Sequence, residues 1–324
     1  MKHVFVFDPK AFYNQQWKMD NILDNIGQFF RTQAKPDFSI QLSRYRRNAI
    51  AIIQDEIEKA KPGDIVRVYA IGGEEIQYDC LNAVAHFPNM ELAIVPYGET
   101  NNFLKIFQTD KNDDKIEIFK DIPVLVNSNT LPTDAIRCGI NYTLNSCYIG
   151  MNSAVSKRVK DLRSSLNKGS FLVYSKISTF FNYIFTAFDK QLAAKQYTIK
   201  IDDTDYSGSY SLIHIANSPY HSGKKTGLSA ASPEDGLLEI ALIKAALPLT
   251  TLSSLRKYSK GKRPKNSIFI QGKSISVHAE TAMWIQLDNE YIQDNHIDLK
   301  IVPHAVQIVA PDGYSYPIGS MPAL

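Results

Sequence analysis

The chain has 324 residues and a mass of 36.5 kDa, longer than one average domain, so two domains are expected. A hydrophobic fraction of 44% and a charged fraction of 21% are typical of folded globular proteins and exclude a disordered or fibrous chain. The net charge of +3 is too small to indicate a nucleic-acid partner, which requires a strong basic excess. Cys80, Cys138 and Cys147 show no CxxC spacing, so the sequence predicts neither disulfides nor a zinc site, and we expect a cytoplasmic protein.

Short apolar runs alternate with helical periodicity in the first third of the chain, which is typical of an α/β sheet with crossover helices. The strands expected here span residues 2–7, 65–71 and 92–95, and the helices span residues 48–61, 77–87 and 101–107. Gly72-Gly73 and Gly98 directly follow two of these strands. Because open α/β sheets bind ligands at the carboxyl ends of their strands, both loops are candidate binding elements.

Beyond about residue 122 the pattern changes to short strands separated by turns, which predicts a mainly β second domain. The strands expected there span residues 134–138, 144–149, 210–216 and 237–243, with one helical stretch at 155–188. We therefore predict an α/β domain over residues 1–125 and a β-rich, sandwich-like domain over residues 126–310.

Five segments, taken in chain order, carry a resemblance to a known family. They are Ala70–Ile76 (AIGGEEI), Val95–Phe103 (VPYGETNNF), Asn145–Gly150 (NSCYIG), Pro233–Ile240 (PEDGLLEI) and Asp288–Glu290 (DNE). They resemble the GGDGT loop, the PxGTxNDF segment, the NxxxxG strand end, the DGLLDV stretch and the late DGE motif of the diacylglycerol kinase catalytic-domain family. This family includes bacterial lipid kinases and sphingosine kinases.

The resemblance implies a fold and a chemistry. The fold would be a nucleotide domain like that of NAD kinases and diacylglycerol kinases, followed by a β-sandwich-like lipid domain. The cofactors would be ATP and Mg²⁺, and the substrate would be diacylglycerol or a similar lipid with a free hydroxyl. Family members often return a C-terminal segment to the first domain, which makes residues 311–324 a candidate for such a return.

Residues around the two glycine loops would bind the nucleotide by this resemblance. They are Ser43, Gly72, Gly73, Glu74, Gly98 and Asn101. Glycines let a backbone approach phosphates closely, because they permit positive φ and carry no Cβ. A plain strand-to-helix turn is the alternative for Gly72 and Gly73, and a helix cap is the alternative for Ser43 and Asn101.

Three carboxylates in the second half of the chain are the other candidates. By resemblance, Asp235 would bind Mg²⁺, a hard ion that prefers oxygen ligands. Glu290 would accept the proton of the lipid hydroxyl, with Asp288 beside it in the catalytic motif. The alternatives are an Asp-Gly turn at Asp235 and an exposed acidic turn between two strands at Glu290.

The nucleotide loops depart from the family pattern. Glu75 stands where the family has a glycine and Ile76 where it has a threonine, while Glu74 and Asn102 replace aspartates. A glutamate held in the left-handed conformation of that glycine would cost about 1–2 kcal/mol of strain, and its charge would repel phosphates. The alternative hypothesis is therefore a catalytically impaired lipid-binding or regulatory module. A soluble NAD or small-molecule kinase is a third hypothesis, which Asp288–Glu290 opposes.

The distribution of basic residues bears on partners other than the substrate. Two basic stretches, residues 157–163 and 256–265, are candidates for contact with anionic headgroups, and solvated surface is the alternative. We therefore leave open a peripheral membrane contact, and also a homodimer. His214, His221 and His304 have no metal-ligand spacing, so we interpret them as structural or surface residues.

Overall fold

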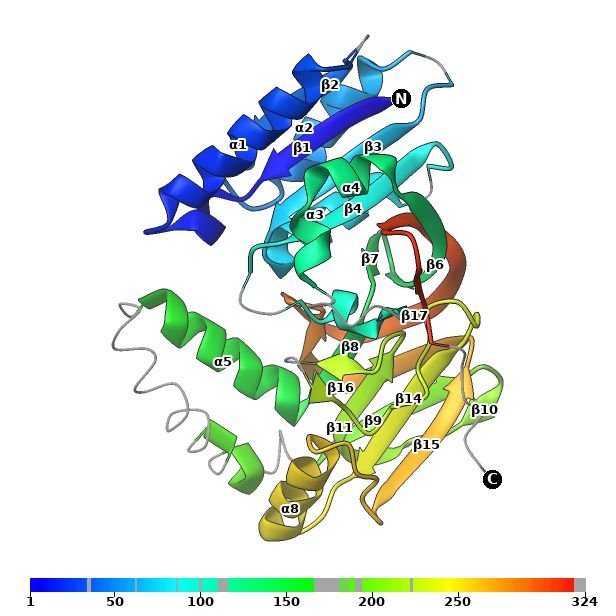
Figure 1. Ribbon diagram of the computed structural model, residues 1–324. Helices are drawn as coiled ribbons and strands as arrows, with labels where there is room; N and C mark the ends of the chain where they lie inside the picture. The colour runs from blue at the N-terminus through cyan, green and yellow to red at the C-terminus, as the bar shows by residue number, and fades with distance from the viewer. Residues whose placement is uncertain are drawn as a thin grey trace. The chain divides into compact units, whose positions relative to one another are not determined.

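The structure is a computed structural model that describes residues 1–33, 36–61, 63–85, 87–98, 101–109, 116–165, 182–183, 186–189, 194–221 and 224–317. Contacts divide the chain into two compact units (Figure 1). The first unit is made of Met1–Ala135, Pro233–Asp235 and Val302–Ile318, and the second is made mainly of Ile136–Ser232 and Gly236–Ile301. The sequence predicted a domain boundary near residue 125. This division into independently folding domains stays a prediction.

The first unit is the expected α/β element (Figure 1). Its main elements are β1 (Lys2–Phe7), α1 (Gln16–Arg31), β2 (Phe38–Leu42), α2 (Asn48–Glu58), β3 (Val66–Gly72), α3 (Glu74–Val84) and β4 (Met90–Pro96). Shorter pieces are η1 (Pro9–Phe12), η2 (Phe103–Ile106), β5 (Gln108–Thr109), η3 (Glu117–Lys120) and α4 (Ile122–Asn127). The strands pair in parallel in the order β2-β1-β3-β4, so the loops after all four strands open at one edge.

The continuous apolar runs of the central strands explain this sheet. Every residue of β1 and β3 is buried, as expected of parallel strands covered by helices on both faces. Helix α1 buries Met19, Ile22, Ile26 and Phe30, one stripe of an otherwise polar helix, and it was not predicted from the sequence. Since parallel crossovers are right-handed, α1 lies on the opposite face of the sheet from α2 and α3.

The end of the chain adds strands to the first unit. Strand β17 (Glu290–Ala310) reaches it with its last residues, where Gln307 and Ile308 pair in parallel with β4. Strand β18 (Tyr314–Ser315) then pairs with β5. The ring of Tyr316 stacks at 5.1 Å on that of Phe107, and its hydroxyl lies 2.6 Å from Thr133 Oγ1. Residues 318–324 lie outside the described part of the chain.

The second unit consists mostly of antiparallel strands, which confirms the predicted β-rich domain (Figure 1). Its strands are β7 (Asn141–Thr143), β8 (Ser146–Gly150), β9 (Lys195–Ile201), β10 (Thr204–Asp205), β11 (Gly208–Ala216), β12 (Tyr220–His221), β13 (Lys224–Lys225), β14 (Leu238–Lys244), β15 (Ser267–Gly272), β16 (Ser274–Leu287) and the first part of β17. Strand β6 (Asn129–Cys138) enters this unit with its last residues and pairs there with β7. The helices α5 (Met151–Ser165) and α8 (Pro248–Tyr258) accompany the strands.

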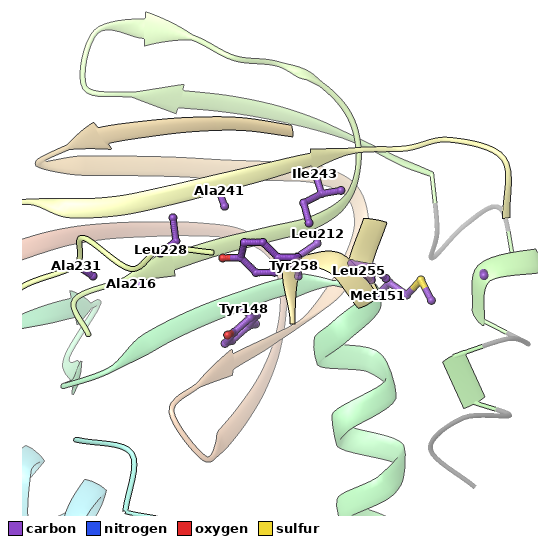
Figure 2. Close-up of a cluster of buried hydrophobic side chains, with 11 residues drawn as sticks. Tyr148, Met151, Leu212, Ala216, Leu228, Ala231, Ala241, Ile243, Leu255 and Tyr258 are labelled. Carbon is purple, nitrogen blue, oxygen red and sulfur yellow. The ribbon is translucent and has the colours of Figure 1, made fainter. Parts of the chain in front are cut away.

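A cluster of buried apolar side chains fixes α8 on the strands of the second unit (Figure 2). The cluster includes Leu255 and Tyr258 from α8, together with Tyr148, Leu212 and Ile243 from strands. Figure 2 shows the Tyr258 ring among these strand side chains. One side of α8 is therefore fixed in the core.

Several predicted element limits differ from the observed ones. Helix α2 ends at Glu58 instead of residue 61, and α3 begins at Glu74 instead of residue 77. A short 3₁₀ helix at Phe103–Ile106 replaces the helix predicted at 101–107. The helix predicted at 155–188 is α5 in its first part, and most of the remainder lies outside the described residues.

Candidate functional site

The two glycine loops of the first unit touch each other through their backbones. Gly73 is the N-cap of α3, and a Cβ added to Gly98 would lie 2.5 Å from the Gly73 Cα. Tyr97 N donates to Gly72 O at 3.0 Å and fixes the second loop beside the first. The absence of a side chain at Gly98 is thus required by packing, because no larger residue fits without moving the backbone.

Gly72 is required for a different reason. It has a φ of +154°, and an added Cβ would lie 2.9 Å from both Asp8 Cβ and Ile76 Cγ2. Ile76, which stands where the family has threonine, is buried at 3% exposure. The loop has therefore exchanged a hydroxyl for an apolar contact beneath Gly72.

Glu74 links the two loops by hydrogen bonds. Its Oε1 accepts from Asn102 Nδ2 at 2.7 Å and from Asn102 N at 3.4 Å. Asn102 is buried, so this pair is largely shielded from water. Asn101 lies next to it, and its Oδ1 is buried without a hydrogen-bond partner among the described residues. Asn101 Oδ1 can therefore accept a hydrogen bond from a bound ligand.

Glu75 lies in the first turn of α3 with an exposed side chain. Its backbone is helical, so the left-handed strain expected at this position is absent and that expectation is corrected. A carboxylate is stabilised at a helix N-terminus by the helix dipole. The charge of Glu75 is still unfavourable for other anions nearby. Burial raises the pKa of the Asp8 carboxyl, and the negative charge of Glu75 raises it further.

The loop after β2 carries Ser43 and a residue that the sequence did not reveal. Ser43 N donates to Phe7 O at 2.8 Å, and α2 begins only at Asn48 with Arg47 as its N-cap, so Ser43 does not cap this helix. Arg47 has a φ of +66°, and its N and Nη1 donate to the Asp79 carboxylate at 2.8 and 3.1 Å. These contacts fix the Ser43 loop against α3.

Asp288 holds a turn of the second unit in place. Its Oδ1 accepts from the backbone N of Asn145 and of Ser146 at 3.0 and 2.9 Å, and its Oδ2 accepts from Leu144 N at 3.0 Å. Burial raises the pKa of the Asp288 carboxyl, and these amides counteract that shift because they stabilise the anion. The carboxylate of Asp288 is thus used to fix the start of β8.

Glu290, two residues later, is the first residue of β17 and is only 4% exposed. The alternative of an exposed acidic turn is therefore wrong. Lys160 Nζ donates to Asn289 O at 2.8 Å and fixes the turn that presents Glu290. A buried carboxylate on a fixed turn is suited to accept a proton from a bound hydroxyl.

Asp235 lies in an exposed turn before β14, where Gly236 has a φ of +69°. This geometry fits the Asp-Gly turn that the sequence left open. Across the residues that the structure describes, no three His, Cys, Asp or Glu side chains form a group that could hold a metal. Asp235 therefore offers one carboxylate, which suits only an ion that keeps most of its ligands from water or substrate.

His214 and His304 behave as structural residues. The ring of the buried His214 stacks on Tyr148 at 3.9 Å, and its Nδ1 lies 2.5 Å from Tyr258 Oη. His304 N donates to Asp134 Oδ1 at 2.9 Å. Neither residue belongs to a group of potential metal ligands within the described ranges.

Comparison with known sequences and structures defines the class of protein. The diacylglycerol kinase catalytic domain matches residues 3–138, and the YegS C-terminal NAD kinase beta sandwich-like domain matches residues 145–310. A protein of Staphylococcus aureus strain JH9 named "Putative lipid kinase" is 26% identical over 308 residues, which cover 92% of this chain and 95% of the relative. The protein of the same name from strain N315 has the same identity and coverage.

Solved structures show the same fold. A "putative diacylglycerol kinase" from Bacillus anthracis strain Sterne superposes with a TM-score of 0.70 at 20% identity, over 96% of this chain and 97% of that one. A second structure, described as a diacylglycerol kinase from the same strain, gives a TM-score of 0.66 at 17% identity with the same coverage. The two-unit architecture of this chain is thus the fold of these two structures. The chain belongs to the diacylglycerol kinase catalytic-domain family, with a YegS-type C-terminal domain.

Proposed function

We propose that the chain is an ATP-dependent lipid kinase that phosphorylates a hydroxyl of diacylglycerol or a related lipid. The observation that carries the proposal is the close approach of Gly73 and Gly98 at the N-terminus of α3. Helix N-termini that follow glycine loops bind phosphates through free backbone N–H groups. ATP would supply the transferable γ-phosphoryl group at this place.

The acidic side chains of the loops influence how a nucleotide can bind. Glu74 is engaged with Asn102, whereas Glu75 places a negative charge on the first turn of α3. A free polyphosphate is repelled by this charge, and a nucleotide that carries Mg²⁺ is repelled less. We therefore propose Mg²⁺ as the companion of the nucleotide, with Asp235 as a protein carboxylate that binds it.

Glu290 is the proposed base. Its carboxylate takes the proton from the lipid hydroxyl as that oxygen forms its bond to the γ-phosphorus, and the bond between the γ-phosphorus and the bridging oxygen of ADP breaks. A positioned base contributes about 10²- to 10⁴-fold to such a step. Asp288 acts as a positioning residue, because its carboxylate fixes the neighbouring turn. Asn101 Oδ1 is a proposed contact of the nucleotide.

Transfer of labelled phosphate from γ-labelled ATP to a panel of detergent-dispersed lipid alcohols tests this proposal. The panel includes diacylglycerol, monoacylglycerol, sphingosine and ceramide, and NAD serves as a non-lipid acceptor. We expect Mg²⁺-dependent labelling of a lipid by the natural chain, at a rate at least about 10²-fold higher than that of Glu290→Gln. ATP binding is measured separately, so that a chain that binds no nucleotide is distinguished from one that lacks the right acceptor.

The alternative of a non-catalytic lipid-binding module makes the opposite prediction. In that case ATP would not change the melting temperature of the protein, and the protein would not change the fluorescence of an ATP analogue. A Glu75→Gly, Ile76→Thr variant would recover part of both responses. Labelling of NAD rather than a lipid would favour the soluble kinase hypothesis.

A further inference from the structure

Basic residues are concentrated in one part of the second unit. No acidic residue occurs between Glu239 and Glu280, a segment that contains eight lysines and arginines. None occurs between Asp205 and Glu234 either. Outside the first segment, 28 basic residues stand against 33 acidic ones, so the positive net charge of the chain comes from this region.

The structure brings these residues together around the C-terminal end of α8. We define the α8 basic surface as Lys224, Lys225, Arg256, Lys257, Lys260, Lys262, Arg263 and Lys265, all of which are exposed. A Cβ added to Gly261 would lie 3.5 Å from Lys225 O, and one added to Gly227 would lie 3.3 Å from Lys262 O. The β12–β13 hairpin and the segment after α8 are therefore neighbours.

The outer face of α8 is amphipathic along its length. On the inner face of the helix, Thr251 is buried, and Leu255 and Tyr258 belong to the cluster of Figure 2. Leu249 and Arg256 are seven residues apart, which places them on the same outer face, two turns from each other. Leu249 and the preceding Leu247 are each 77% exposed. A helix of 11 residues, about 16 Å long, thus presents two leucines at one end and cations at the other.

The basic residues of α5 behave differently. Lys157 Nζ pairs with Asp161 Oδ2 at 2.6 Å and lies 5.1 Å from the Trp284 ring, while Lys160 holds Asn289 O. These side chains are used inside the unit. Within the described ranges, by contrast, no residue of the α8 basic surface forms an ion pair. Of the two basic stretches singled out from the sequence, the second is thus the one available to a partner.

We infer that the outer face of α8 and the α8 basic surface dock on an anionic lipid bilayer. The cations attract negative headgroups, and Leu247 and Leu249 enter the boundary between headgroups and acyl chains, as an interfacial amphipathic helix does. A polyanion such as a nucleic acid would use the cations and leave the exposed leucines without a role. The inference rests on the proposed function in one respect, since a kinase that acts on bilayer lipids must reach the membrane.

Vesicle co-sedimentation of the full-length chain, without nucleotide, tests the inference. We expect binding to phosphatidylcholine vesicles that contain phosphatidylglycerol, weak binding to phosphatidylcholine alone, and a steep decrease with added salt. The variant Lys257→Gln, Lys260→Gln, Lys262→Gln should bind about a hundredfold more weakly, at roughly fivefold per charge. The variant Leu247→Ser, Leu249→Ser should lose at least about tenfold.

A matched control variant removes three positive charges from a different part of the second unit. Lys200 on β9, Lys273 in the turn before β16 and Lys300 on β17 are exposed and lie outside the α8 basic surface. Their replacement by glutamine removes the same charge and should change vesicle binding by less than about threefold. Circular dichroism and thermal melting confirm that each variant is folded.

Activity on detergent-dispersed lipid separates this inference from the proposed function. The α8 variants should keep that activity and lose activity on vesicles. If the chain binds vesicles through α8 but never phosphorylates lipid, the docking inference is supported and the proposed kinase activity is overturned. Equal binding by both triple variants, no binding to anionic vesicles, or a preference for single-stranded nucleic acid over vesicles would overturn the docking surface.

Discussion

Asn102 donates two hydrogen bonds to Glu74, so one carboxylate holds the second glycine loop against the first. The family pattern has aspartate at both positions, whereas this chain has an amide opposite a longer carboxylate. The two changes complement each other, because an amide donates where a second carboxylate would repel. The altered loops thus form a consistent pair of contacts.

Asn102→Asp should destabilise the chain although it restores the family residue. It would place two carboxylates in contact in a buried pair, which costs about 2–4 kcal/mol in the free energy of unfolding. Urea denaturation measures this loss. Adding Glu74→Gln should restore stability to within about 1 kcal/mol, since the new amide donates to Asp at position 102. Additive losses in the double variant would disprove the coupling.

Gly98→Ala should abolish nucleotide binding and lower stability. The added methyl would lie 2.5 Å from Gly73 Cα, so one of the two loops must move. We expect a loss of about 2 kcal/mol or more from such overpacking, and no thermal shift with ATP. Gly27→Ala is the matched control, because nothing lies within 4 Å of its Cβ in helix α1 and helix propensity should stabilise it by up to about 1 kcal/mol.

Asp288→Asn and Glu290→Gln should separate structure from chemistry. Asn at position 288 tolerates the φ of +50° but cannot accept from all three amides, so it should lower the free energy of unfolding by about 2–3 kcal/mol. Glu290→Gln is nearly isosteric and should lower kcat by at least about 10²-fold while KM changes little. Stability and steady-state kinetics are measured on both variants. A kcat unchanged in Glu290→Gln removes its role as base.

Stability should fall in acid partly through His3. Its Nδ1 lies 2.9 Å from Tyr69 Oη, and burial, Arg67 and the N-terminus lower the pKa of His3 from 6.5 to about 4. Because folding lowers the pKa of His3, the folded state favours the neutral ring. The free energy of unfolding that this ring contributes is fully present above pH 6.5 and is lost as the pH falls towards 4. The loss reaches about 3 kcal/mol. The variant His3→Gln should lack this component, and equal pH dependence in both proteins would contradict the assignment.

Glu75→Gln should tighten ATP binding without changing the fold. Glu75 is exposed in the first turn of α3, so its repulsion of phosphate is screened and we expect a gain of about 3- to 10-fold in affinity at low salt. Isothermal titration measures the affinity. Glu58→Gln, an exposed change at the end of α2, controls for net charge. A gain of the same size in Glu58→Gln would show that the effect of Glu75 is not local.

The sequence predicted the parts of the fold that depend on local pattern. Continuous apolar runs indicated β1, β3 and β4, and glycines after two of them indicated where the chain turns. Helix α1 was not predicted, because only four buried residues form its apolar stripe and the rest of its sequence is polar. The first turn of α3 escaped because two acidic residues directly after Gly73 do not resemble an apolar helix start.

Contacts distant in sequence could not be predicted in the same way. Asn102 lies 28 positions from Glu74, and Arg47 lies 32 positions from Asp79. Asp288 bonds to amides 142 to 144 positions before it, and its role in holding β8 follows only from the folded chain. Sequence order therefore identified the family, whereas tertiary packing decided which carboxylates are structural.

We propose that this chain, with its acidic loop, still transfers phosphate to a lipid. The most direct test is the labelling of detergent-dispersed diacylglycerol and related lipids from γ-labelled ATP with Mg²⁺, compared between the natural chain and Glu290→Gln. We expect a labelled lipid product from the natural chain and at least about 10²-fold slower labelling by the variant. Absence of product from the whole lipid panel, or equal labelling by both proteins, would contradict this proposal.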